Sequence, residues 1–129
     1  MKTGAEIRDR ALTLLHYVDQ AGRLRSDLYA DLYARSLDIV NQIYGDLWYT
    51  THTTTFEQLG SLADTVMLPG RIRDDVMPYG VAMLMAQTIG DGDNQNLYAS
   101  LYSRKRTRAA SQDCRVDIWS KGGRRCDDG

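Results

Sequence analysis

Apolar positions recur at the spacing of an amphipathic α-helix over most of this chain. The first helical segment runs from residue 4 to about 20, after a capping box formed by Thr3 and Glu6. The second runs from Ser26 or Asp27 to about Tyr49, and apolar side chains fill roughly half of its circumference. This arc is wider than one neighbouring helix covers, so we expect another copy of the chain to cover part of it.

Three tyrosines, Tyr29, Tyr33 and Tyr44, lie at the margin of this apolar arc. Tyrosine combines an apolar ring with a polar hydroxyl, so it suits both the edge of a core and an interface with a wet rim. The pattern leaves both interpretations open. These three residues are the candidates for a subunit interface.

A third helical segment follows Pro69 and Gly70 and ends near Ile89. Pro78 lacks a backbone N–H, so the helix either kinks there or restarts with Pro78 in its first turn. From Tyr79 onward almost every position is apolar or small. This pattern predicts a helix that is buried on all sides and lies at the centre of the fold.

The connection over residues 50–68 loses the helical period and is rich in Thr. We expect a long loop here, with a short strand at 53–56 or 64–68. Near the C-terminus, Val116 and Ile118 alternate with other residues in a strand-like pattern.

Together these segments predict a mainly α fold. We expect a small four-helix bundle over residues 5–110, with a long loop between its second and third helices. An extended, strand-like C-terminal arm is expected over residues 111–129.

The sequence GDGDNQ, residues 90–95, has the acidic and amide residues of a calcium loop. Counted from Asp91, however, the sixth position is Asn96 and the twelfth is Tyr102, where an EF-hand requires Gly and Glu. Gly90 is suited to end one helix, and Asp91 or Asp93 to cap the next. The segment is therefore predicted to be a corner between two helices, without a metal.

Composition narrows the class of protein. The longest near-apolar run, VAMLMA, is far shorter than the ~20 residues of a membrane span, and no signal peptide is visible, so we expect a protein that stays in the cytoplasm where it is made. Cys114 and Cys126 lack a neighbouring His, so no disulfide or zinc site is expected. His16 and His52 are far apart and no catalytic motif is present, which argues against an enzyme and against a cofactor.

The charge is distributed unevenly. Residues 1–100 carry 13 acidic and 8 basic residues, a net −5, whereas residues 101–129 carry 4 acidic and 8 basic residues, a net +4. Four cations cluster at the end of the fourth helical segment, Arg104, Lys105, Arg106 and Arg108, and Arg115 follows. Cations favour a helix C-terminus, but this number exceeds what a cap needs. We expect contact with an acidic partner or with passing DNA.

Two stretches, DLYARSLDIVNQIYGDLW and SLADTVMLPGRIRDDVMPYGVAMLMAQTIGDGDNQNLYASLYSRKRTR, carry a resemblance over about residues 5–108. The chain resembles the small head–tail connector (adaptor, or head-completion) proteins of tailed bacteriophages. The shared pattern is a helix ending near aromatics, a Leu-Pro entry, a buried helix with Pro-Tyr, a Gly-Asp corner and a last helix with LYxRKR.

The resemblance implies a helical virion subunit without catalytic activity, made in the host cytoplasm. Such subunits assemble into a ring, typically a dodecamer, beneath the portal at the head–tail junction. The ring extends the channel through which viral double-stranded DNA passes, and it offers a platform for the next neck or tail protein.

We expect Val116, Ile118 and Trp119 to anchor the chain to the portal by strand addition, with Arg115 and the 104–108 cations giving electrostatic complementarity. Two alternatives stay open. One is a small DNA-binding regulator of the helix-turn-helix type, which would show salt-dependent duplex binding. The other is a helical interaction subunit of non-viral origin.

Overall fold

The computed structural model describes residues 2–25 and 29–119, and side chains as far as Ala109. The fold is mainly helical, as predicted. Its elements are α1 (Gly4–Leu14), α2 (Ala30–Ala34), α3 (Ser36–Thr51), α4 (Gly70–Asp75), α5 (Met77–Ile89) and α6 (Gly92–Trp119). No helix among these residues is long and apolar enough to cross a membrane.

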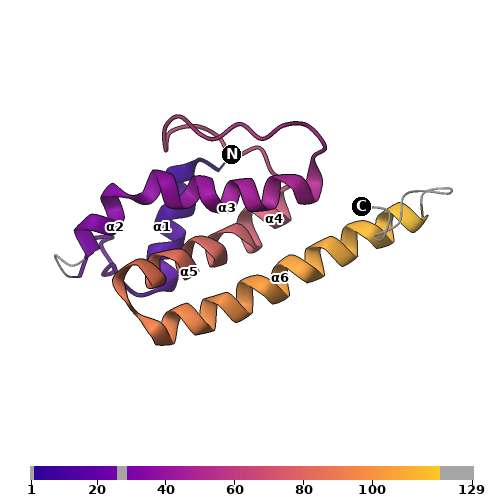
Figure 1. The fold of residues 1–129 in the computed structure, drawn as a ribbon. Coiled ribbons are helices and arrows are strands. Elements are labelled where there is room, and N and C mark those ends of the chain that lie inside the picture. Colours follow the sequence, from indigo (N-terminus) through magenta and orange to yellow (C-terminus); the bar gives the residue numbers. More distant parts are fainter. Residues whose placement is uncertain (1, 26–28, 120–129) are drawn as a thin grey trace.

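Helix α5 lies at the centre of the bundle, between α1, α3 and α6 (Figure 1). Val81, Ala82, Met85 and Ala86 are fully buried, which agrees with the predicted central position. Gln87 and Thr88 are exposed, however, so α5 is not buried on all sides as predicted. Gly80 allows a close approach of α5 and α6, because a Cβ at this position would lie 2.7 Å from Cε1 of Tyr102.

Helix α1 ends at Leu14, so the predicted continuation to about residue 20 is wrong. His16 adopts the left-handed conformation with φ of 62°, and the His16 and Tyr17 amides bond back to the Thr13 and Leu12 carbonyls, each at 3.1 Å. This is a Schellman termination. It buries Tyr17, whose ring stacks on Tyr29 with centroids 4.2 Å apart.

The second predicted helix is divided into α2 and α3 at Arg35, where φ is −93° and ψ is 3°. Ser36 follows, fully buried, and its hydroxyl donates to the Leu32 carbonyl at 2.9 Å. The third predicted helix is likewise divided at Val76, and Pro78 lies in the first turn of α5. The restart at Pro78 is thus the alternative that the structure adopts.

The long connection from His52 to Pro69 folds over α3 (Figure 1). Tyr44 of α3 makes an edge contact with Phe56, and its hydroxyl accepts from the Met67 amide at 3.0 Å. The chain's own loop therefore covers the apolar arc here, where a second copy had been expected. Neither predicted strand forms, because only Thr65 pairs, in an isolated bridge to Thr3.

The C-terminal segment also differs from the expectation. Helix α6 continues to Trp119, so residues 111–119 are helical where an extended arm was predicted, and the helix passes through the expected boundary at 110/111. Between Asp93 and Trp119 the chain has no Gly or Pro. The alternation at 116–119 is too short to outweigh a helix already formed, since extending a helix is easier than starting a strand. The rest of the arm, residues 120–129, lies outside the described residues.

Candidate partner-binding surface

The corner at residues 90–95 sets the direction of α6. Gly90 has φ of 76°, and the Asp91 carboxylate accepts from the Asn94 amide at 3.3 Å and from the Asn94 side chain at 2.7 Å. The Tyr17 hydroxyl also donates to Asp91, at 2.6 Å. These bonds agree with the predicted corner and Asp91 cap, and the described residues contain no cluster able to hold a metal.

The hydrogen bonds at this corner shift two pKa values in opposite directions. The Tyr17 bond, helped by Asn94 and opposed by burial, lowers the pKa of Asp91. Burial, followed by the bond to Asp91, raises the pKa of Tyr17. Asp91 therefore stays ionised and Tyr17 protonated, which fixes the start of α6 against the turn after α1.

Two tyrosines of α6 attach it to the body. The Tyr98 hydroxyl donates to the Leu14 carbonyl at 2.7 Å, and the Tyr102 hydroxyl donates to the Asp46 carboxylate of α3 at 2.5 Å. Burial, and then the bond to Asp46, raises the pKa of Tyr102. The first half of α6 is thus anchored at both α1 and α3.

The predicted basic cluster divides into two groups. Lys105 pairs with Asp75 of α4 at 3.0 Å and lies over the Tyr79 ring, 4.6 Å from its centroid. Arg106 pairs with Asp46 at 3.1 Å. These two cations hold α6 to its own chain, a role that the sequence pattern did not predict.

The other two cations, Arg104 and Arg108, are exposed. The closest polar contact of Arg104 is the Ser100 hydroxyl at 3.5 Å, one turn earlier on α6. Both are on one side of the helix because they are four residues apart. Of the predicted cluster, they are the members best placed to meet a partner.

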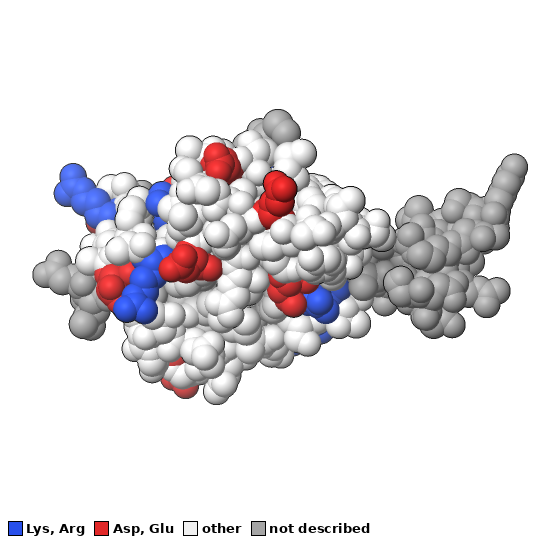
Figure 2. Space-filling view, turned by 45° about the horizontal axis from the view of Figure 1, so that its top comes forward, with Lys and Arg blue, Asp and Glu red and all other residues white. Residues whose placement is uncertain are grey.

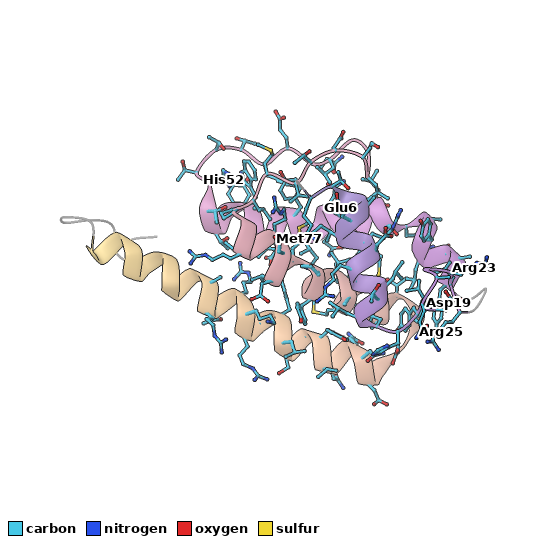
Figure 3. All side chains as sticks on the ribbon, turned by 180° about the vertical axis from the view of Figure 1, so that it is seen from behind. Glu6, Asp19, Arg23, Arg25, His52 and Met77 are labelled. Carbon is cyan, nitrogen blue, oxygen red and sulfur yellow. The ribbon has the colours of Figure 1, made fainter. Side chains whose placement is uncertain are left out.

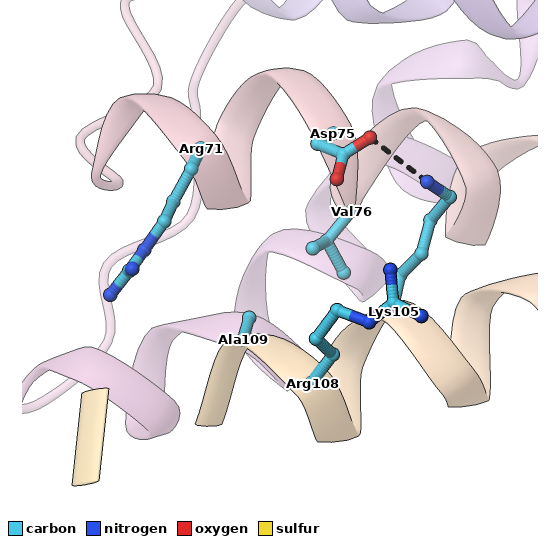
Figure 4. A pocket seen from close by; sticks show the side chains of 6 residues that line it. All are labelled: Arg71, Asp75, Val76, Lys105, Arg108 and Ala109. Carbon is cyan, nitrogen blue, oxygen red and sulfur yellow. Dashed lines mark hydrogen bonds and ion pairs between the residues drawn. The ribbon is translucent and has the colours of Figure 1, made fainter. Parts of the chain in front are cut away.

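A cleft of about 180 Å³ lies between α4 and α6 (Figure 4). It is lined by Arg71, Asp75, Val76, Lys105, Arg108 and Ala109. Among the lining residues that the structure describes, three side chains are cationic and one is acidic. We call it the α4–α6 cleft.

On the face that Figure 2 shows, acidic and basic side chains lie next to one another at two places within a mostly uncharged surface. Figure 3 places His52 at one end of the body and the turn with Asp19, Arg23 and Arg25 at the other. Since His16 is three residues before Asp19, the two histidines do not form a common site.

The three candidate interface tyrosines have different environments. Tyr33 is 45% exposed, with the Arg8 guanidinium 4.1 Å from its ring centroid, and Tyr29 is half-buried against Tyr17. Tyr44 is only 3% exposed, because the long connection covers it. The structure thus places Tyr44 in the core, and only Tyr33 presents a substantial free surface.

Helix α6 also contains the other predicted docking residues, Arg115, Val116, Ile118 and Trp119, but their side chains lie outside those described. On a helix, Val116 and Trp119 are within roughly 80° of Ala109 around the axis, whereas Ile118 is on the opposite side. A strand would have grouped Val116 with Ile118 instead. Because the backbone is helical, Val116 shares a side of α6 with Trp119 rather than with Ile118.

Sequence reasoning missed the acidic partners of α6, Asp46 and Asp75. They are 60 residues from Arg106 and 30 residues from Lys105 along the chain, so no local spacing indicates the pairs. The neighbouring carboxylates Asp74 and Asp75 have different partners: Arg73 bonds Asp74 at 2.9 Å, and Lys105 bonds Asp75 at 3.0 Å. Comparison of the chain with protein families, curated proteins and solved structures gave no match.

Proposed function

We propose that this chain is a structural subunit of the neck of a tailed bacteriophage. In this role it forms a ring beneath the portal, extends the DNA channel and offers a platform for the next neck or tail protein. The proposal starts from the resemblance over residues 5–108, and the described fold is of the helical type that the resemblance implies.

The observation that carries the proposal is the length of α6. Its 28 residues correspond to about 42 Å, against about 20 Å for the 13 residues of α5. Ala109 is the last buried residue described, and Figures 1 and 3 show α6 continuing past the rest of the body. Because most helices in proteins are stabilised by tertiary packing, a projecting segment is suited to pack on another molecule.

The sequence of this projecting segment matches that role. Val116 and Trp119 continue the side of α6 that Ala109 packs on the body, while Arg104, Arg108 and Arg115 fall in a row beside it. An apolar anchor with adjacent cations is typical of an interface in which packing gives affinity and charge gives orientation. We infer that α6, rather than an added strand, docks on the portal.

The test uses the purified chain and the portal protein of the same phage. Deleting residues 111–129 should abolish binding to the portal while circular dichroism still reports a helical body. Val116→Ser with Trp119→Ser should also abolish it, whereas Ile118→Ser, on the opposite side of α6, should bind as the parent chain does. Equal losses from both sets would contradict a helical docking face, and unchanged binding after the deletion would contradict the proposal itself.

Light scattering and electron microscopy of the mixture test the assembly. A ring on the portal is the expected result. A dimer that binds duplex DNA, with affinity falling steeply as salt rises, would favour the regulator instead.

A further inference from the structure

We propose that the α4–α6 cleft is a binding site for the carboxylate of an acidic side chain from a protein partner. The inference extends the docking role of α6 and in that respect rests on the proposed function. What it adds is a defined site within the body, and the chemical group that this site takes.

The cleft combines a charged rim with an apolar floor. Val76 and Ala109 form part of its lining and are 2% and 8% exposed. Arg108 and Lys105 approach from α6 (Figure 4). A Glu or Asp side chain matches this combination, because its methylene groups can lie against the floor while its carboxylate reaches the cations.

The two α6 cations that line the cleft, Lys105 and Arg108, differ in whether their side chains are already paired. Lys105 is held by Asp75 at 3.0 Å, and one such bond leaves other ammonium N–H groups able to donate. Arg108 is exposed, and its guanidinium has no hydrogen bond or ion pair to any residue within the described part of the chain. An incoming carboxylate can therefore contact Lys105, which Asp75 holds in place, and form an ion pair with Arg108.

Asp75 shows that a carboxylate is accepted at this position. Its side chain is 64% exposed while that of Lys105 is 24% exposed, so the pair lies at the entrance of the cleft. A second carboxylate beside Asp75 is tolerated only if the excess positive charge compensates it. Among the described residues of α6, Lys105 and Arg108 against the single carboxylate of Asp75 provide that excess.

A phosphodiester backbone fits this cleft less well than a side chain does. Duplex DNA presents a row of phosphates along an extended surface and is bound by cations spread over a comparable length. Here the cations surround a single cavity of about 180 Å³ whose floor is apolar. An acidic side chain of a protein is therefore the occupant that the geometry favours.

The experiment titrates the full isotope-labelled chain with a capped oligo-glutamate peptide and follows the NMR signals of Val76 and Ala109. We expect saturable shifts at both residues. Arg108→Glu and Arg108→Gln should each weaken binding by about tenfold or more, since a charge-assisted bond is lost. Arg10→Glu, the same charge change on an exposed residue of α1, should leave binding close to that of the parent chain.

Parallel titrations with inorganic phosphate and with a short DNA duplex identify the class of ligand. Phosphate should produce weak, non-saturating shifts, and the duplex should not bind the cleft more tightly than the peptide. The proposal is overturned if the peptide gives no saturable shift, if Arg10→Glu weakens binding as much as Arg108→Glu, or if phosphate or duplex saturates these signals first. Portal binding is measured separately, so a failure here is distinguishable from a failure of the proposed function.

Discussion

Asn41 of α3 holds the long connection through two hydrogen bonds to Leu59. It is 8% exposed; its side-chain amide donates to the Leu59 carbonyl at 3.0 Å, and its carbonyl accepts from the Leu59 amide at 2.7 Å. Leu59 is itself buried, at 6% exposure. Asn41→Ala therefore leaves two buried backbone groups without these partners.

The expected loss of stability follows from this geometry. Each buried polar group left unsatisfied costs about 1–3 kcal/mol, so the loss of both partners in Asn41→Ala should lower the free energy of unfolding by about 2–6 kcal/mol. A domain of this size is stable by only about 5–15 kcal/mol. The midpoint of thermal unfolding should fall by roughly 10 °C or more.

Urea unfolding followed by circular dichroism measures the effect. Gln42→Ala, at the neighbouring exposed position of α3, is the matched control and should change stability by less than about 0.5 kcal/mol. Asn41→Asp separates the two bonds, because it keeps an acceptor for the Leu59 amide but sets a carboxylate against the Leu59 carbonyl. If Asn41→Ala were no more destabilising than Gln42→Ala, the inference that Asn41 fixes the connection would be refuted.

The Asp variant also has a predictable pH dependence. Contact with the Leu59 carbonyl and burial both raise the folded-state pKa of the new carboxyl above its usual value of about 3.9. A raised acid pKa favours the protonated form, which can donate to that carbonyl. The variant should therefore be closest to the parent below about pH 4 and lose stability as pH rises through the folded-state pKa. A difference independent of pH would contradict the assigned geometry.

Three further perturbations test the attachment of α6. Gly80→Ala should destabilise the chain by about 1–3 kcal/mol in urea unfolding, because its Cβ would overlap the Tyr102 ring at 2.7 Å. Gly92→Ala is the control and should not destabilise the chain, because a Cβ there would have nothing within 4 Å. Equal effects of the two substitutions would contradict the close packing at Gly80. Tyr102→Phe should cost about 1–2 kcal/mol by removing the bond to the half-exposed α3 carboxylate, and an unchanged urea midpoint would argue against that bond. Since the bond from Tyr17 lowers the pKa of Asp91, the stability due to its ionised form is present above about pH 4 and is lost as pH falls below it. The difference in unfolding free energy between the parent chain and Asp91→Asn should therefore shrink over that range, and a constant difference would contradict the assignment.

Local sequence signals identified the central helix and the corner at Gly90. They offered Asp91 or Asp93 as the cap, and the structure uses Asp91. These features depend on neighbours within a few residues, through helical period, left-handed backbone and side-chain capping. The end of α1 at Leu14 and the break at Arg35 are not indicated by the residue types around them. His16 in the left-handed conformation replaces the Gly expected at a Schellman end, and what favours it is the burial of Tyr17 against Tyr29.

The candidate site was predicted only in part. The local density of cations at 104–108 indicated a basic segment, but charge density does not say which cation is already paired. Lys105 and Arg106 are bound by Asp75 and Asp46, and Arg108 is left at the cleft. These assignments need contacts between α6, α4 and α3, which distant parts of the chain bring together.

The helical class, the buried centre and the position of the basic segment can therefore be predicted from the chain, because each depends on the spacing of neighbouring residues. Contacts between distant parts of the chain fix what covers the apolar arc of α3 and which of the described cations face outward. Those outcomes depend on which surfaces meet in space, and burial and charge pairing across long sequence separations leave no periodic signal along the chain.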